Sequence, residues 1–383
     1  MRVGLITTLN VNIGDRFIRE GICLVLREVF RDREMEFVAV NKHEPLTVYP
    51  DWHPVHLAKL THYLPRGRTS ASRLVERLAS RLRFSAFDTC DLIVQCGAPV
   101  FWPGCHRCEW AEPLWHHVVG RLSERIPVLN LAMGSCYPWE RRPTRIDDPR
   151  DAEYLRAILD YCRLTTVRDT LAQSLCGSLG TQAMMIPCSA LLAAGGAPSA
   201  GPGNETVLIN YMRGGGHYEW DQGIEDNAWR ETAKRLIGRL RRRHKLAFLC
   251  HNQAEYQSAQ ELDSTLPRMW PKTPSEYFDQ ASGCAVALCN RMHASVGLAG
   301  MGIPSVAVGT DTRLLMVRAI GLPCLYVKDA SVERLEEGLE NLLRFRTQWQ
   351  ERLLALRSET WSDYVNAIAS ATHLVKETVQ ASR

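Results

Sequence analysis

The sequence predicts an α/β protein with two Rossmann-like domains that face each other across a cleft. Short apolar runs alternate with longer amphipathic runs, which is typical of parallel sheets with helical crossovers. At 383 residues the chain exceeds one ordinary core. A small-residue segment rich in glycine and proline then interrupts the alternation. The expected parts are an N-terminal domain, a linker, a C-terminal domain and a helical tail, over residues 1–192, 193–205, 206–345 and 346–383.

The first domain is expected to begin with a strand, a turn and a helix in which Asp15 stands at the start. Apolar runs predict strands at Val3–Thr8, Glu36–Asn41, Asp91–Gly97, Pro127–Met133, Leu164–Val167 and Ala183–Pro187. Helical patterns follow at Asp15–Phe30, Ala71–Arg83 with Ser70 as its cap, Glu112–Arg121, Asp151–Cys162 and Thr170–Leu179. Strands and helices that alternate in this way predict a parallel sheet.

The same order restarts after the linker. Strands are expected at Thr206–Tyr211, Leu246–Cys250, Cys284–Cys289, Pro304–Val308 and Leu325–Val327. Helices are expected at Glu225–Arg243, Ala294–Gly300, Ser331–Phe345 and Thr347–Glu377. Two facing domains of this kind are GT-B-like, and by analogy with such folds the last helix should cross back onto the first domain.

Composition excludes few classes of protein. The net charge of +4 is too small to indicate nucleic-acid binding. Two basic stretches, Arg66–Arg83 and Arg239–Lys245, are best explained by solvated helices, although an anionic acceptor or a membrane surface stays open. Neither a signal peptide nor a spanning segment is recognisable, so we expect a cytoplasmic protein that keeps its 13 cysteines reduced.

One cysteine pair has the spacing of a functional motif. Cys105 and Cys108 form a Cys-x-x-Cys pattern that would suit half a zinc site or a redox pair. A second such pair does not follow, and His116 and His117 are adjacent on an expected helix. An ordinary loop is therefore favoured, and neither a metal nor another cofactor is predicted.

The stretch from Cys289 to Gly309 is the strongest candidate for a site. Asn290, Arg291 and His293 lie where a buried strand ends and a short helix of small residues begins. Ligands bind at this edge of parallel sheets, and helix N-termini favour anions. Arginine suits phosphate or carboxylate, whereas histidine exchanges a proton near neutral pH.

Other strand ends carry matching chemistry. Arg213 follows a strand and precedes three glycines, and Arg313 follows another strand. Asp15 can serve as a cleft residue or as a helix cap. Trp102 can stack on a sugar ring or simply pack in the core. Arg168 and Asp169 are expected to act structurally, through a salt bridge and a helix cap.

Several of these motifs, taken together, resemble the polysaccharide pyruvyl transferases. The matching pieces are Asn12-Ile-Gly-Asp15, Val167-Arg-Asp-Thr170, Arg213, Arg291-Met-His293, Gly302-Ile-Pro304 and Thr310-Asp-Thr-Arg313. Three positions depart from the pattern. Only Gly97 remains of a glycine-rich turn, Cys188 stands where relatives often carry Asp, and Arg313 stands where they mostly carry Lys.

The resemblance implies a reaction in which phosphoenolpyruvate donates a pyruvyl group to two hydroxyls of a sugar. His293 would then be the acid in catalysis, and the base stays open, with Asp15 across the cleft as a candidate. Donor binding would fall to Arg213, Asn290, Arg291 and Arg313, and acceptor binding to Asn12, Gly97 and Trp102. A sugar, a glycan or a lipid-linked saccharide would be the acceptor, the last with peripheral membrane contact.

Three alternatives stay open. The first is a nucleotide-sugar glycosyltransferase of the same fold, in which Glu255 or Asp311 would grip a ribose. The second is a relative that acts on a small non-glycan acceptor, and the third is a non-catalytic binding protein.

Overall fold

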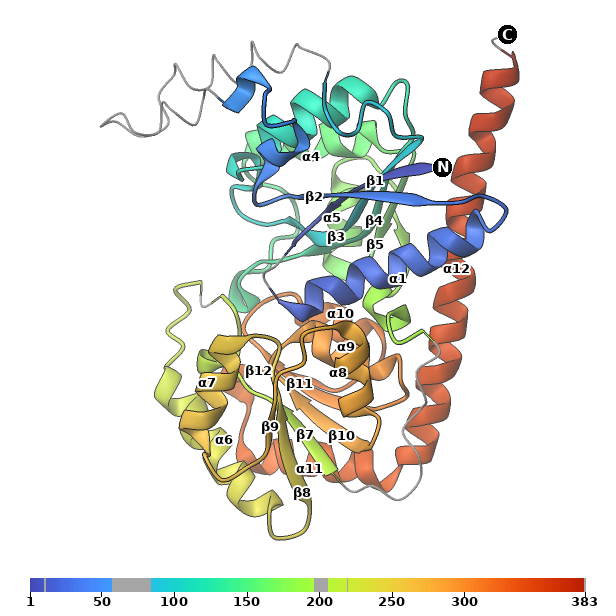
Figure 1. Ribbon diagram of the computed structural model, residues 1–383. Coiled ribbons are helices and arrows are strands. Elements are labelled where there is room, and N and C mark those ends of the chain that lie inside the picture. Colours follow the sequence, from blue (N-terminus) through green and yellow to red (C-terminus); the bar gives the residue numbers. More distant parts are fainter. Residues whose placement is uncertain (10–11, 57–83, 196–205, 219, 382–383) are drawn as a thin grey trace.

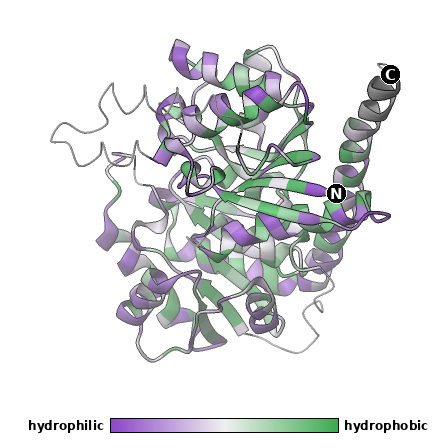
Figure 2. Cartoon of the chain, turned by 45° about the horizontal axis from the view of Figure 1, so that its top comes forward, coloured by the Kyte–Doolittle hydropathy of each residue, from purple (hydrophilic) through white to green (hydrophobic). Residues whose placement is uncertain are grey.

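A computed structural model describes residues 1–9, 12–56, 84–195, 206–218 and 220–381 (Figure 1). Two α/β domains are stacked, and one long helix runs along both of them. The helix predicted at 71–83 with its cap at Ser70, the basic stretch at 66–83 and most of the predicted linker lie outside the described residues. Hydrophobic residues concentrate in the strands and on the inward faces of the helices, while hydrophilic residues cover the outside (Figure 2).

The first domain is a parallel sheet in the order β2-β1-β3-β4-β5-β6. Its strands are β1 (Arg2–Thr7), β2 (Glu36–Asn41), β3 (Leu92–Phe101), β4 (Val128–Ser135), β5 (Leu164–Val167) and β6 (Met184–Met185). Helix α1 (Ile13–Val29) covers one face of this sheet. The other face is covered by α4 (Pro149–Tyr161), α5 (Thr170–Ser178) and a π-helix at Ala111–Gly120. Burial on both faces explains the continuous apolar runs in the sequence.

The second domain is a parallel sheet in the order β12-β11-β10-β7-β8-β9. Its strands are β7 (Thr206–Asn210), β8 (Lys245–Leu249), β9 (Arg268–Met269), β10 (Cys284–Cys289), β11 (Ser305–Gly309) and β12 (Cys324–Tyr326). Its helices are α6 (Asp226–Leu240), α7 (Gln253–Leu262), α8 (Pro274–Ala281), α9 (Met292–Ala299), α10 (Leu314–Ala319) and α11 (Val332–Arg344). Single-turn helices lie at Pro45–Val48, Pro54–His56, Cys105–Arg107, Trp139–Arg141, Ser189–Leu192, Arg213–Gly215 and Val327–Asp329. Two Rossmann-like sheets are therefore confirmed.

One hydrophobic core crosses the boundary between the domains and includes residues of α1, α8, α9 and α12 (Arg346–Ala381). The small residues of α9 make this contact close. A Cβ on Gly297 would meet the Phe17 ring at 3.0 Å, and one on Gly300 would lie 2.1 Å from the Leu191 carbonyl oxygen. The expected crossing of the C-terminal helix is also confirmed, since the Tyr364 hydroxyl donates to the Pro187 carbonyl at 3.0 Å.

A strap from the first domain, residues 135–141, holds the loop after β11. The Ser135 hydroxyl donates to the Thr312 hydroxyl oxygen at 2.9 Å, and the Tyr137 amide donates to the same oxygen at 2.9 Å. The Thr312 amide in turn donates to the Tyr137 carbonyl at 3.0 Å. These bonds connect the carboxyl end of β4 with the carboxyl end of β11, so the two sheet edges that could bind ligands are held together.

The basic residues at the end of α6 are neutralised within the molecule. Arg239 forms ion pairs with Glu333 and Glu336 of α11, and Arg243 forms ion pairs with Glu336 and Glu340. This agrees with a solvated helix end and leaves little free positive charge there for an anionic surface. None of the described helices combines the length and the apolar character needed to cross a bilayer.

Candidate active site

A cavity of about 340 Å³ lies where the carboxyl ends of the two sheets meet. The first domain contributes Thr8, Asn12, Asp15, Lys42, His43 and Trp102. The second domain contributes Met212, Gly216, His217, Tyr218, residues 290–293 and 309–311, Arg313, Leu314 and Met316. In both sheets the strand order reverses here, between β1 and β3 and between β7 and β10. The cavity therefore occupies the position at which doubly wound sheets bind ligands.

The start of α1 brings the first domain onto the second. Asn12 caps the helix by accepting from the Asp15 amide at 3.2 Å, and its own amide donates to Asp15 Oδ2 at 2.5 Å. Asn12 is therefore the cap, and Asp15 belongs to the first turn. A Cβ on Gly14 would meet His293 Cβ at 3.0 Å, so glycine permits this close approach. Burial raises the pKa of Asp15, while the charges of Lys42 and Arg291 oppose the rise.

Asn290 joins three strand ends of the second domain. Its Oδ1 accepts from the Met212 amide at 2.9 Å, and its Nδ2 donates to the carbonyls of Gly215 and Val308 at 3.1 and 3.0 Å. These bonds occupy the side-chain amide. Asn290 lines the cavity, but these hydrogen bonds make it a support for the loops rather than a free donor to a ligand.

Arg291 is paired with a buried carboxylate. Its Nε donates to Glu255 Oε1 at 2.6 Å, and the side chains are 13% and 4% exposed. Glu255 Oε2 also accepts from Asn210 Nδ2 at 2.8 Å and from the His251 amide at 2.9 Å. Burial alone would raise the pKa of Glu255, but the charge of Arg291 and these bonds keep it below its ordinary value. Arg291 is thus held in one position.

Arg313 is paired in the same way. Its Nε and Nη2 donate to the two oxygens of Asp311 at 2.9 and 2.6 Å. The guanidinium also lies 4.9 Å from the centre of the Tyr218 ring. A lysine could not form this two-pronged contact, so arginine at this position keeps the charge and adds a fixed orientation.

His293 accepts a hydrogen bond from the first domain. Arg168 Nη1 lies 3.3 Å from His293 Nε2. A guanidinium can only donate, so Nε2 is the acceptor and the imidazole is neutral with its proton on Nδ1. Burial, followed by the charges of Arg168 and Arg313, lowers the pKa of His293 well below its ordinary range. The residue expected to act as the acid is therefore neutral in this structure.

Arg168 is the site residue that the sequence argument missed. Its side chain is 1% exposed, and Nη1 also lies 3.7 Å from Cys188 Sγ. Within the described part of the chain, Nη2 has no hydrogen-bond partner and no carboxylate pairs with this guanidinium. The expected salt bridge with Asp169 does not form. Asp169 instead caps α5 through the Ala172 amide at 2.8 Å, as predicted, and accepts from the Ser135 amide at 2.8 Å.

A family model described as polysaccharide pyruvyl transferase matches residues 12–312. The chain belongs to the polysaccharide pyruvyl transferase family. The match includes Asn12, Arg291 and His293, which line the cavity, and Arg168, which contacts His293 from outside the lining. This is a family of transferases, in agreement with the resemblance of the motifs.

The solved structures similar to this pyruvyl transferase family member show its fold. A UDP-GlcNAc 2-epimerase from Neisseria meningitidis bound to UDP-GlcNAc has 10% identity and a TM-score of 0.55, with 99% of this chain and 100% of that chain covered. The UDP-bound MnaA of S. aureus has 12% identity and a TM-score of 0.52, with 98% and 94% covered. Among curated proteins, none matches the chain. At such low identity these structures support the GT-B-like fold alone.

Two predicted site residues of this family member lie away from the cavity. The Arg213 side chain is 62% exposed and pairs with Glu261 of α7. Positive φ angles at Gly214 and Gly215, of 61° and 76°, form the turn beside it. Gly97 is buried, and a Cβ there would lie 2.6 Å from Ile18. Arg213 therefore belongs to the surface, Gly97 packs against α1, and Trp102 remains at the cavity.

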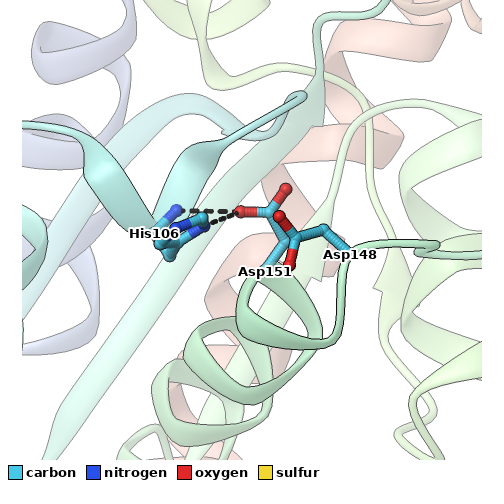
Figure 3. Close-up of side chains that lie close together, drawn as sticks. All are labelled: His106, Asp148 and Asp151. Atoms are coloured by element: carbon cyan, nitrogen blue, oxygen red, sulfur yellow. Dashed lines mark hydrogen bonds and ion pairs between the residues drawn. The ribbon is translucent and has the colours of Figure 1, made fainter.

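The Cys-x-x-Cys loop is anchored to α4 (Figure 3). Asp151 Oδ1 lies 2.5 Å from His106 Nδ1, and its Oδ2 accepts from the Gly104 amide at 2.7 Å. Asp148 lies beside them, but its oxygens accept from the Arg150 amide and guanidinium. Burial raises the pKa of the Cys108 thiol to about 11. Protein donors satisfy both carboxylates, and the raised pKa disfavours the thiolate that metal binding or redox chemistry needs, so an ordinary loop explains this cluster.

Proposed function

We propose that this protein transfers the pyruvyl group of phosphoenolpyruvate to two hydroxyls of a saccharide and forms a pyruvate ketal. One observation carries the proposal. The charges of Arg168, Arg291 and Arg313 all act on His293 at one end of the cavity. A donor with a phosphate and a carboxylate matches such a set of guanidiniums, whereas an uncharged ligand does not.

The free N–H groups of the arginines specify where anions would bind. Arg291 uses Nε for Glu255, so its two terminal nitrogens remain available to a ligand. Arg313 keeps Nη1, whereas Arg168 lies behind His293, outside the cavity lining, and its Nη2 is buried. Since Glu255 and Asp311 neutralise two of the three guanidiniums, Arg168 supplies the uncompensated positive charge. We therefore assign Arg291 and Arg313 to the donor in place of Arg213, with Arg168 acting through its charge and through its contact with His293.

The proposed reaction uses His293 as the acid and Asp15 as the base. The anions of the donor raise the pKa of His293, which takes up a proton and delivers it to the methylene carbon. A first acceptor hydroxyl bonds to the adjacent carbon and loses its proton to Asp15. The carbon–oxygen bond to phosphate then breaks, and the second hydroxyl closes the ketal. The two acceptor hydroxyls release two protons in total. One of them makes up for the proton that His293 delivers to the methylene carbon, and the other leaves with the phosphate.

Replacement of His293 by Asn tests the assignment. Turnover is expected to fall by about 10²- to 10⁴-fold, because proton transfer is lost. Phosphoenolpyruvate should still raise the midpoint of thermal unfolding, because the arginines are intact. Product formation from labelled phosphoenolpyruvate and the midpoint shift are measured on the same samples. Full activity of His293→Asn would show that this residue is not catalytic. If phosphoenolpyruvate does not change the unfolding midpoint of the wild-type protein, the proposal is wrong.

A nucleotide-sugar glycosyltransferase is the second candidate, because similar folds bind UDP-GlcNAc or UDP in the solved structures. The two acids that would grip a ribose are already engaged, Glu255 with Arg291 and Asp311 with Arg313. This weakens the second candidate. A panel of nucleotide-sugars in the same unfolding assay separates the two, since only one class of donor should raise the midpoint.

A further inference from the structure

Lys42 is a buried cation that the proposed reaction does not use. It follows β2 directly, is 5% exposed and lines the cavity. Its ammonium lies 4.7 Å from the centre of the Trp110 ring. Among the described residues, no carboxylate lies within ion-pair distance of this ammonium and no oxygen accepts a hydrogen bond from it.

An ammonium in this position is unfavourable in the ligand-free protein. Burial removes its water, and a ring face compensates only part of that loss. Desolvation accordingly lowers the pKa of Lys42. The charges of Asp15 and Glu109 act on Lys42, but neither carboxylate forms an ion pair with it. A buried cation that opens onto a cavity without an ion-paired carboxylate is satisfied when a ligand supplies the anion. The residue therefore points to a ligand anion at the first-domain wall.

We propose that Lys42 binds a carboxylate or phosphate on the saccharide acceptor, so that the acceptor is an acidic saccharide. That the bound saccharide is the acceptor of the reaction rests on the proposed function. That Lys42 binds an anion does not depend on the proposed function. The chemistry shared by the two groups is a negative charge attached to a sugar ring.

The neighbours of Lys42 favour the acceptor over the donor. Trp102 lines the same first-domain wall, and its ring lies 5.3 Å from the Trp110 ring on which Lys42 rests. His43 is fixed beside them, with Nδ1 at 2.7 Å from Glu109. A sugar ring stacked on Trp102 would direct a charged substituent to Lys42 and its hydroxyls to Asp15. Arg291 and Arg313 lie instead on the second-domain wall, together with His293.

Unfolding midpoints with simple sugars test the proposal on the full chain. Glucuronate and glucose 1-phosphate serve as charged probes, and glucose is the uncharged control. The wild-type midpoint is expected to rise with at least one charged probe and not with glucose. Lys42→Met should lose this rise. Lys234→Met, at a surface pair with Glu231, is the matched control and should keep it. A response to only one charged probe identifies the group as carboxylate or phosphate.

Two further readouts keep the test decisive. Lys42→Met should retain the midpoint shift with phosphoenolpyruvate, whereas Arg291→Ala should lose it. If Lys42→Met also loses that shift, Lys42 belongs to the donor and the proposal is wrong. Without added ligand, the unfolding midpoint of Lys42→Met should equal or exceed that of the wild-type protein. A clear decrease would show that Lys42 stabilises the fold rather than binding a ligand. Equal binding of glucose, or no response to either charged probe, would also overturn the proposal. Failure of phosphoenolpyruvate alone would contradict the proposed function and leave the sugar result standing.

Discussion

The two walls of the cavity hold their positive charges differently. On the second-domain wall, Arg291 and Arg313 each bind a buried carboxylate of their own domain. The first domain contributes Lys42 on the wall and Arg168 behind His293, and neither forms an ion pair in the described part of the chain, although the charge of Asp15 acts on Lys42. One wall is therefore satisfied without a ligand, whereas the other carries charge that a ligand must neutralise.

This difference suggests that the two walls act on a bound anion in different ways, one by orienting it and the other by attracting it. Paired arginines have fixed positions, so they can orient an anion but add little net charge. Unpaired buried cations cost stability in the free protein, and they recover it only when an anion binds. Proteins often retain such unfavourable groups where function requires them. The comparison predicts opposite stability effects for substitutions on the two walls.

The largest effect is expected at Arg168. Arg168→Met should lower the rate by about 10²- to 10³-fold, as does removal of a donor that stabilises charge in a reaction. The ligand-free protein should unfold at the same temperature as wild type or higher, because no ion pair is lost. Initial rates test the expected loss of activity, and thermal unfolding without ligand tests the expected stability. Arg168→Lys keeps the charge but not the planar geometry, so it should recover only part of the rate. Normal activity of Arg168→Met would refute the role.

Glu255→Gln should have the opposite effect on stability. The substitution leaves Arg291 buried and unpaired, which costs about 3 kcal/mol of unfolding free energy. Because folding lowers the pKa of Glu255, its contribution is present above the unfolded value of about 4.3 and disappears as pH falls through the folded value. Chemical denaturation at neutral pH and below pH 4 measures this. Glu261→Gln, at the exposed partner of Arg213, is the control. Equal losses in the two variants would show that burial of the pair contributes nothing.

A smaller effect is expected where the strap joins the walls. Thr312→Val keeps the shape of the side chain but removes the oxygen that accepts from Ser135 and Tyr137. Loss of these bonds should cost about 1–2 kcal/mol of stability. It should also weaken phosphoenolpyruvate binding modestly, because Arg313 is the next residue. Denaturant unfolding and donor titration test this, with Thr232→Val on the exposed face of α6 as control. If Thr312→Val leaves the affinity for phosphoenolpyruvate unchanged, the strap contributes to stability but not to donor binding.

The smallest effect is expected at Arg213. Arg213→Ala removes an exposed pair outside the cavity, so neither the rate nor the midpoint shift with phosphoenolpyruvate should change measurably. Side-by-side rates with Arg168→Met provide the scale. A loss comparable to that of Arg168→Met would return Arg213 to the donor site.

The sequence predicts the sheets better than it predicts the side elements. Buried parallel strands are continuous apolar runs, so β1, β7 and β10 could be placed within a residue or two. Helices α7, α8 and α10 are short, and their boundaries depend on caps such as Asn252 and Thr273 rather than on an apolar face. Periodicity alone therefore does not reveal them.

The candidate site was predictable in part. Position after a strand correctly placed Arg291, His293 and Arg313 at the cavity. The same rule applies to Lys42, which follows β2, and would have found it. It failed for Arg213, because the glycine turn directs that side chain to the surface. Arg168 could not be placed at the site from the sequence, because its neighbour Asp169 has a sufficient structural role as a helix cap. The contact between Arg168 and His293 joins residues far apart in the sequence, so only the fold shows it.

Calorimetric titration with phosphoenolpyruvate, performed in two buffers of different ionisation enthalpy, tests the central claim most directly. Neutral His293 must gain a proton when anions bind beside it. The titration should therefore show binding with net proton uptake, and Arg168→Met should abolish the binding. His293→Asn should bind the donor without the proton uptake. Absence of binding by the wild-type protein, or binding that Arg168→Met leaves unchanged, would contradict the account.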